Sequence, residues 1–297
     1  MPSGGGGGGV DRDGVGRDGV RRDAVSRVAR RPRGGAPDLE PTRIADLFDR
    51  NVATYDRVNT LITFGLDGGW RRWVARQAVP FAFGAPASPA SGRRASMRGA
   101  GEPASSPVLP RPVLDACAGT GLLALDLARR GATVTAVDAA PGMLAVARAR
   151  LNAAELSLRT VVADLSDPAA AGALGGPFEA VTLGFGLRYF ADPGALLRLL
   201  RGLLAPGGRL VVVEAVRPPR DLLGAAAGFY FFEVAPRLGT ALAGRAELYD
   251  FLTASTRALG SADDVAAYLR AAGFGVVVRR RFACGAVAGF VAEPALS

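Results

Sequence analysis

The pattern of hydrophobic and polar positions from residue 112 onward predicts strands that alternate with helices. Short apolar runs predict seven strands, at 113–117, 133–137, 158–162, 178–183, 209–213, 275–282 and 285–292. Helical spacing predicts helices between or beside them, at 122–130, 141–151, 196–204, 221–239 and 262–272. This alternation predicts an α/β fold, with a mostly parallel seven-stranded sheet and helices on both of its faces.

The predicted main domain spans residues 112–297. The chain before it divides into three segments. Residues 1–41 begin with a glycine run and continue without an apolar face, so we expect a disordered tail. Residues 42–82 show helical spacing and predict an N-terminal helical element. Residues 83–111 are rich in Pro, Ser, Gly and Ala and predict a flexible linker.

The composition excludes several kinds of catalysis. The chain has 36 basic residues, all of them Arg, and contains no His and no Lys. It therefore has no His base, no His metal ligand and no Lys for a Schiff base or a P-loop. Its 2 Cys cannot build a Cys₄ zinc site, and no metal site is expected. Chemistry must come from Asp, Glu, Tyr, Arg, backbone amides or a cofactor that is itself reactive.

The net charge of +9 would ordinarily suggest a nucleic-acid partner. Residues 1–40 hold eight Arg and six acids, and residues 83–111 hold four Arg and one Glu, so the predicted tail and linker carry much of the charge. We therefore expect no nucleic-acid binding. Because no apolar stretch is long enough to span a bilayer, we expect a cytoplasmic protein; peripheral contact with the inner face of the membrane stays open.

Acidic side chains stand at the carboxyl ends of the first three predicted strands. They are Asp115, Asp138 and Asp164, and a glycine-rich turn at 119–121 follows the first of them. Ligands of open α/β sheets bind outside these strand ends, where a carboxylate such as Asp138 can accept from both hydroxyls of a ribose. Since residues 119–124 also fit the relaxed GxGxxA pattern, a dinucleotide site stays open, as does a turn with a purely structural role.

Two features favour methyl transfer over dinucleotide binding. Asp115 within the first strand, and the Leu-Ala-Pro-Gly-Gly-Arg-Leu turn at 204–210, are typical of S-adenosylmethionine (SAM) methyltransferases. Further motifs resemble the UbiE/MenG family of quinone C-methyltransferases over about 42–292, apart from the predicted linker. These motifs are Phe48-Asp49, Tyr55-Asp56 with Asn59, Phe64-Gly65, Trp70-Arg71, Phe185-Gly186-Leu187-Arg188, Tyr230 to Gly239, and Tyr249 with Ser255.

The resemblance implies a class I, Rossmann-like SAM methyltransferase with SAM as its cofactor and residues 42–82 as a helical lid. The residues that it places against SAM are Tyr55, Asp56, Asp115, Gly119, Thr120, Gly121, Asp138, Ala139, Asp164, Leu165 and Gly184. Arg188 matches an arginine of the family that acts in deprotonating the acceptor ring. Because the chain has no His, we expect Arg188 to stabilise a phenolate, while Tyr55 or Tyr189 orients the ring.

The chain departs from the family in the acceptor half. Gly184 replaces a Ser, Tyr189 replaces an Asn, and the C-terminal motif at 284–290 lacks its His. Three functions therefore stay open: a C-methyltransferase for a demethylmenaquinol-type or ubiquinol-precursor ring, a methyltransferase for another aromatic or polyketide acceptor, and a non-catalytic SAM-binding module. The aromatic run at 229–232 could line a site for a lipophilic acceptor, touch a membrane, or be ordinary core. A homodimer also stays open.

Overall fold

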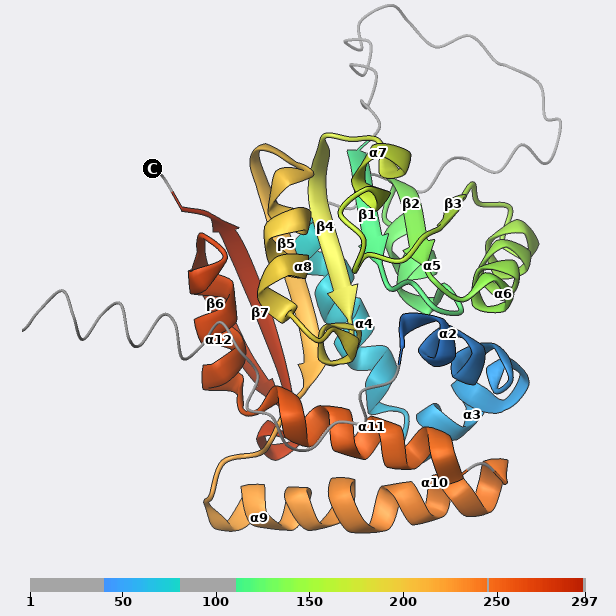
Figure 1. Cartoon of the computed structure of the whole chain (residues 1–297), viewed down its shortest axis with the longest axis vertical. Helices are drawn as coiled ribbons and strands as arrows, with labels where there is room; N and C mark the ends of the chain where they lie inside the picture. The colour runs from blue at the N-terminus through green and yellow to red at the C-terminus, as the bar shows by residue number, and fades with distance from the viewer. Residues whose placement is uncertain (1–39, 81–110, 245, 296–297) are drawn as a thin grey trace, which may run out of the picture.

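The computed structural model describes residues 40–80, 111–244 and 246–295, so the predicted tail and linker lie almost wholly outside the described residues. A seven-stranded sheet with the order β3-β2-β1-β4-β5-β7-β6 forms the centre of the molecule (Figure 1). Its strands are β1 (Arg111–Ala116), β2 (Ala132–Asp138), β3 (Arg159–Val162), β4 (Phe178–Gly184), β5 (Leu204–Ala215), β6 (Phe274–Phe282) and β7 (Val287–Pro294). All seven were predicted, and the α/β fold with a mostly parallel sheet is confirmed.

The strand pairing fixes where a ligand can bind. β1 pairs in parallel with both β2 and β4, whereas β7 runs antiparallel to its neighbours β5 and β6. The chain leaves β1 for β2 on one side and reaches β4 on the other, so the direction of winding reverses between β1 and β4. Such a reversal opens a crevice at the carboxyl ends of the strands.

Helices cover both faces of the sheet. On one face, α8 (Pro193–Gly202) and α12 (Ala262–Ala271) bury their leucines against β4, β5 and β7. On the other face, α4 (Leu66–Ala78) and α5 (Leu122–Ala128) form a second core with β1 and β5, and α6 (Pro141–Ala153) packs beside β2 and β3. A short helix, α7 (Ala170–Leu174), precedes β4.

The helical segment at 42–82 divides between two places in the fold. Trp70 and Trp73 of α4 are buried in the core, and Trp73 lies so close to Gly289 of β7 that a Cβ there would stand 2.5 Å from its ring. α4 is thus part of the sheet domain. The preceding helices, α2 (Pro41–Asp49) and α3 (Val52–Ile62), lie below the carboxyl ends of β1 to β3 (Figure 1).

The lower layer of Figure 1 consists of helices that follow β5. α9 (Leu222–Phe229), a π-helical turn at Tyr230–Val234 and α10 (Ala235–Ala243) form one continuous rod, and α11 (Ala246–Leu259) lies above it. α11 falls outside the predicted helices, although Leu248, Phe251, Ser255 and Leu259 are buried at helical spacing. Within the described part of the chain, every helix is too short or too polar to cross a membrane.

Candidate functional site

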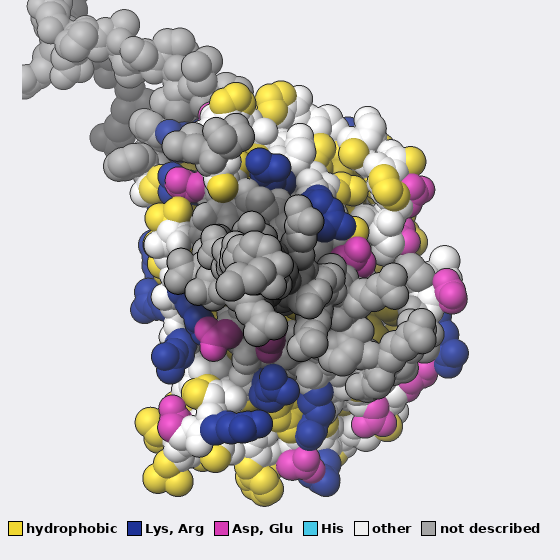
Figure 2. Space-filling view, turned by 60° about the vertical axis from the view of Figure 1, so that its left-hand side comes forward, with side chains coloured by type: hydrophobic (Ala, Val, Ile, Leu, Met, Phe, Trp, Pro, Cys, Tyr) yellow, Lys and Arg dark blue, Asp and Glu magenta, His cyan; other side chains and the backbone are white. Residues whose placement is uncertain are grey.

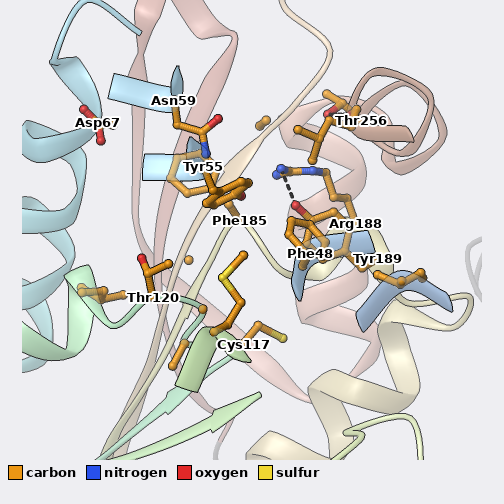
Figure 3. Close-up of a pocket in the computed structure, with 18 of the residues that line it drawn as sticks. Phe48, Tyr55, Asn59, Asp67, Cys117, Thr120, Phe185, Arg188, Tyr189 and Thr256 are labelled. Atoms are coloured by element: carbon orange, nitrogen blue, oxygen red, sulfur yellow. Dashed lines mark hydrogen bonds between the residues drawn. The ribbon is translucent and has the colours of Figure 1, made fainter. Parts of the chain in front are cut away.

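A cavity of about 320 Å³ opens between the carboxyl ends of β1, β2 and β4 and the helices α2, α3 and α11. It is lined by every predicted site residue except Gly121, and Figure 3 shows several of these side chains converging from different elements. These residues come from segments as far apart as α3 and the turn after β4. The fold thus brings into one cavity the site residues that were predicted from separate motifs.

The glycine turn after β1 is held by Asp138 at the end of β2. One carboxylate oxygen of Asp138 accepts from the Gly119 N–H at 2.8 Å, and the other accepts from the Ala140 N–H at 2.9 Å. Gly119 has a φ of +54°, and a Cβ added there would meet no atom of the described residues within 4 Å, so the turn leaves open space beside it. Gly121 has a different role, because a Cβ there would lie 2.6 Å from the Cβ of Ala147 on α6.

Asp115 is the most unusual group of the cavity wall. Its side chain is buried, and its Oδ1 accepts a hydrogen bond of 2.7 Å from the Thr182 hydroxyl. Its Oδ2 has no hydrogen-bond partner among the described residues. Burial raises the pKa of Asp115 to about 7, opposed by the Thr182 hydrogen bond and assisted by the charge of Asp138. A buried acceptor without a partner is costly, and a ligand that carries a donor would satisfy it.

This half of the cavity therefore fits a cationic nucleoside such as SAM. Asp115 and Asp138 provide carboxylate oxygens, which suit an ammonium group and ribose hydroxyls. Met143 and Leu165 add buried apolar surface next to Asp164, which suits a flat heterocycle. We call the part of the cavity lined by Asp115, Gly119, Asp138, Met143, Asp164 and Leu165 the cofactor half.

Two sets of hydrogen bonds fasten α2 and α3 to the cofactor half. Asp56 of α3 accepts from the Thr120 hydroxyl at 2.7 Å and from the Arg150 guanidinium at 2.6 Å. The other terminal nitrogen of the Arg150 guanidinium donates to the Thr120 carbonyl oxygen. Asp49 of α2 accepts from the N–H groups of Gly142 and Met143 at 3.2 and 3.0 Å, where a carboxylate also complements the positive end of the α6 dipole. Arg150 and Asp49 are missing from the predicted site.

Arg188, on the turn after β4, pairs with a glutamate that is missing from the predicted site. Its guanidinium forms an ion pair with Glu214 of β5, and its backbone N–H donates to the other Glu214 oxygen at 3.3 Å. Both side chains are buried. Burial alone would lower the pKa of Arg188, but the neighbouring Tyr189 and Glu214 raise it above its ordinary value, so the cation persists.

Tyr189 and Tyr55 surround the guanidinium on the cavity side. The second guanidinium nitrogen of Arg188 donates to the Tyr189 hydroxyl at 2.8 Å (Figure 3). Burial raises the pKa of both tyrosines, and the positive charge of Arg188 opposes that rise. Both are therefore neutral phenols near pH 7. The ring of Phe48 lies between them, with centroids 5.5 Å from Tyr55 and 5.2 Å from Tyr189.

The rest of the cavity is mainly apolar, and we call it the acceptor half. Its wall comes from the helices α2, α3, α4, α10 and α11, the π-helical turn, the segments that follow β4 and β5, and the start of β7. The residues that line it are Phe48, Tyr55, Ile62, Trp70, Phe185, Arg188, Tyr189, Val216, Phe231, Phe232, Pro236, Leu252, Thr256 and Val287. Such a lining suits a flat, lipophilic molecule that presents one polar edge to Arg188 and Tyr189.

Comparison with known proteins gives one consistent result. The model of the ubiE/COQ5 methyltransferase family matches residues 92–293. The demethylmenaquinone methyltransferase of Thermus thermophilus is 38% identical over 233 residues, which are 77% of this chain and 92% of that protein. Demethylmenaquinone methyltransferases of Clavibacter sepedonicus and Deinococcus radiodurans are 34% and 33% identical, covering 84% and 82% of this chain and 89% and 90% of theirs.

Proposed function

Since the chain belongs to the ubiE/COQ5 methyltransferase family and is a SAM-dependent methyltransferase of the class I fold, we propose that it methylates a ring carbon of a demethylmenaquinol-type quinol. The observation that carries this proposal is the two-part cavity. A carboxylate-lined half meets an apolar, aromatic half, and Arg188, paired with the fully buried Glu214, stands in the wall of the second. The relatives named above, which are quinone methyltransferases by name, support the same acceptor class.

In the cofactor half, the chain's task is binding and orientation. Bound SAM supplies a methyl group on a positively charged sulfur, so the transfer needs mainly in-line positioning of the acceptor. We infer that Asp138 and Asp164 bind the ribose and adenine end, and that Asp115 accepts from the ammonium group through its unpaired Oδ2. Gly119, Ala139, Leu165 and Gly184 would shape this half through backbone and apolar contacts.

We propose that α2 and α3 act as the lid. Asp56 would bind the cofactor indirectly in that case, because it already holds the Thr120 hydroxyl and Arg150. Tyr55, on the same helix, would close over the junction of the two halves. Opening the lid requires breaking the Asp49 and Asp56 hydrogen bonds together, while closing it removes water from the site, which strengthens the electrostatic interactions inside.

In the acceptor half, the chain must make a ring carbon nucleophilic. A quinol ring carbon gains electron density when its hydroxyl loses a proton. We propose that Arg188, held as a cation by Glu214, stabilises the resulting phenolate, and that the neutral Tyr189 phenol donates a hydrogen bond to it. Tyr55 would orient the ring. Because the chain contains no His, a water molecule would carry the hydroxyl proton away. The methylated ring carbon would then lose its own hydrogen as a proton, which returns to the phenolate oxygen and restores the aromatic quinol.

A second candidate acceptor is another aromatic compound, favoured by the residues that depart from the family pattern. Gly184 and Tyr189 stand on the cavity wall, and Tyr189 fills space that a smaller asparagine would leave empty. Quinone profiling of a strain that lacks the gene separates the two candidates. Accumulated demethylmenaquinone is expected, and an unchanged quinone pool would refute the quinol acceptor.

The role of Arg188 is tested with purified enzyme, SAM and a reduced demethylmenaquinone. We expect Arg188→Ala and Arg188→Lys to lower kcat about a hundredfold while SAM affinity by calorimetry stays the same, since lysine cannot form the two-pronged contact. Arg148→Ala, at an exposed position of α6, is the matched control and should keep full activity. Wild-type methylation by Arg188→Lys would contradict the role, and unaltered SAM binding would rule out misfolding as the cause of lost activity.

A further inference from the structure

The rod formed by α9, the π-helical turn and α10 exposes a row of large apolar side chains. Leu222 is 86% exposed, Leu223 is 67% exposed and Phe229 is 65% exposed. Farther along the rod, Leu238 is 44% exposed and Leu242 is 51% exposed. The rod is about 33 Å long at 1.5 Å per residue and runs along the lower edge of the molecule in Figure 1, so these exposed side chains form a stripe along that edge. Single exposed leucines are ordinary, but a stripe of this length marks an interaction surface.

The turn between α3 and α4 extends this stripe. Phe64, at that turn, is 74% exposed, and Leu61 and Leu66 beside it are 59% and 50% exposed. The Phe64 ring lies 5.4 Å from the ring of Tyr230, whose hydroxyl donates to the Ile62 carbonyl oxygen at 2.7 Å. These contacts join the two segments into one surface. We call it the apolar face: Leu61, Phe64, Leu66, Leu222, Leu223, Phe229, Leu238 and Leu242.

Phe64 also has a backbone conformation that phenylalanine rarely adopts. Its φ is +52°, in the left-handed region, where side chains other than Gly, Asn and Asp are uncommon. A bulky apolar residue is thus held in an unfavourable conformation with most of its ring in solvent. A partner outside the chain that covers the ring would explain this combination of exposure and backbone conformation.

The apolar face adjoins the acceptor half of the cavity. Ile62 and Thr63 line the cavity, whereas Leu61 and Phe64 on either side of them are exposed. The π-helical turn repeats the arrangement, because Phe231 and Phe232 line the cavity and Phe229 is exposed. A lipophilic molecule could therefore pass from the apolar face into the acceptor half with little exposure to water.

The charges around the apolar face indicate its partner. Arg71, Arg217 and Arg237 near this face already pair with Asp67, Asp264 and Glu233. Arg57, Arg72 and Arg220 are exposed and form no ion pair among the described residues, against one such acid, Asp221, so positive charge predominates around the apolar face. In Figure 2, hydrophobic side chains gather along the lower edge of the molecule, where α9 and α10 lie, with Arg side chains close above them. An apolar stripe bordered by arginines complements an anionic bilayer. If two copies of the chain met through this face, the arginines of one copy would lie against those of the other and repel them.

We propose that the apolar face lies on an anionic lipid bilayer and that the acceptor enters the cavity there, between the α3–α4 turn and the π-helical turn. The route of the acceptor rests on the proposed quinol function, whereas the lipid binding does not. Phe64, Leu222, Leu223 and Phe229 would reach the acyl-chain boundary, and the arginines would contact headgroup phosphates. The lipophilic tail of the acceptor could then stay in the bilayer while its ring enters the site.

Vesicle co-sedimentation tests the binding. The full chain is mixed with vesicles of phosphatidylglycerol and phosphatidylcholine, or of phosphatidylcholine alone. We expect it to sediment with the anionic vesicles, and less so at high salt. Leu222→Ser/Leu223→Ser/Phe229→Ser should weaken this partitioning at least about tenfold, because each inserted side chain removes apolar area from water. Val277→Ser/Val278→Ser, at two exposed valines of the edge strand β6, is the matched control and should bind as the wild type.

Two activity measurements separate this proposal from the proposed function. A short-tailed demethylmenaquinol in solution should be methylated at the same rate by the wild type and by the triple variant, which also reports intact folding. A long-tailed acceptor in vesicles should be methylated more slowly by the variant. Absence of methylation by either protein would refute the quinol function and leave the vesicle result standing.

Three results would overturn the lipid proposal. They are failure of the wild type to bind anionic vesicles, equal binding by the triple variant, and equal loss of binding in the β6 control. If light scattering shows a wild-type dimer that the triple variant loses, without vesicle binding, then the apolar face is an interface between copies of the chain.

Discussion

The two halves of the cavity are built in different ways. The cofactor half consists of strand ends and a glycine turn, and Asp138 accepts hydrogen bonds from the Gly119 N–H of that turn and from the Ala140 N–H after β2. The acceptor half consists of side chains from helices and turns, and its polar centre is the buried Arg188–Glu214 pair. One half therefore depends on local backbone geometry, while the other depends on a charge pair that must be satisfied as a unit.

The largest expected effect comes from breaking that pair. Glu214→Ala leaves the buried Arg188 cation unpaired and should lower the free energy of unfolding by about 3–5 kcal/mol. Replacing both partners, as Arg188→Met/Glu214→Leu, should restore much of the stability without restoring methylation. Chemical denaturation and a methylation assay measure the two effects. If the double variant were as active as the wild type, the pair would be structural only.

In the cofactor half, we expect the affinity for SAM to depend on pH. Asp115 has a pKa raised to about 7 by burial, and binding of a cationic ligand to its carboxylate requires loss of the proton. SAM affinity should therefore rise with pH and level off above about 7, falling by as much as about tenfold for each unit below that value. Calorimetry in buffers of different ionisation enthalpy should detect the released proton.

Asp115→Asn is the control for this prediction. It should bind SAM more weakly than the wild type at pH 8, and its affinity should be independent of pH between 5 and 8. The raised pKa also means that unliganded wild-type protein loses stability as pH rises from about 4 to about 7, and the variant should lose less. A variant with an unchanged pH profile would show that another group titrates.

The sequence was informative about the cofactor half and the sheet, because their signals are local. Apolar runs, a glycine turn and acids at strand ends lie within a few residues of one another, and their arrangement follows from parallel pairing. Glu214 could not be found this way, since a glutamate within an apolar strand gives no sign that Arg188, 26 residues away, will meet it. Asp56 and Arg150 are 94 residues apart in the sequence. Their contact depends on how α3 packs at the carboxyl ends of the strands.

Weakening the hydrogen bonds that hold α3 against the cofactor half should have a smaller effect on SAM binding. Asp56→Asn weakens the hydrogen bonds to Thr120 and Arg150, so α3 should open more often and SAM should bind about tenfold more weakly. Amide hydrogen exchange over residues 41–62 should become faster. Arg43→Ala breaks an exposed ion pair with Glu247 and should change neither measurement appreciably. Unaltered exchange in Asp56→Asn would indicate that the Asp49 contacts hold the lid alone.

The smallest effect refines the assignment of the titrating group to Asp115. The Thr182 hydroxyl donates to Asp115 Oδ1 and lowers the pKa of that carboxyl, so the isosteric Thr182→Val should raise the pKa further. The midpoint of the SAM affinity profile should then move to higher pH by about one unit, which corresponds to one modest hydrogen bond. Thr135→Val, at another buried threonine of the sheet, should leave the midpoint in place. A shift to lower pH would mean that the hydroxyl favours the protonated carboxyl, and an unmoved midpoint would assign the titration to a group other than Asp115.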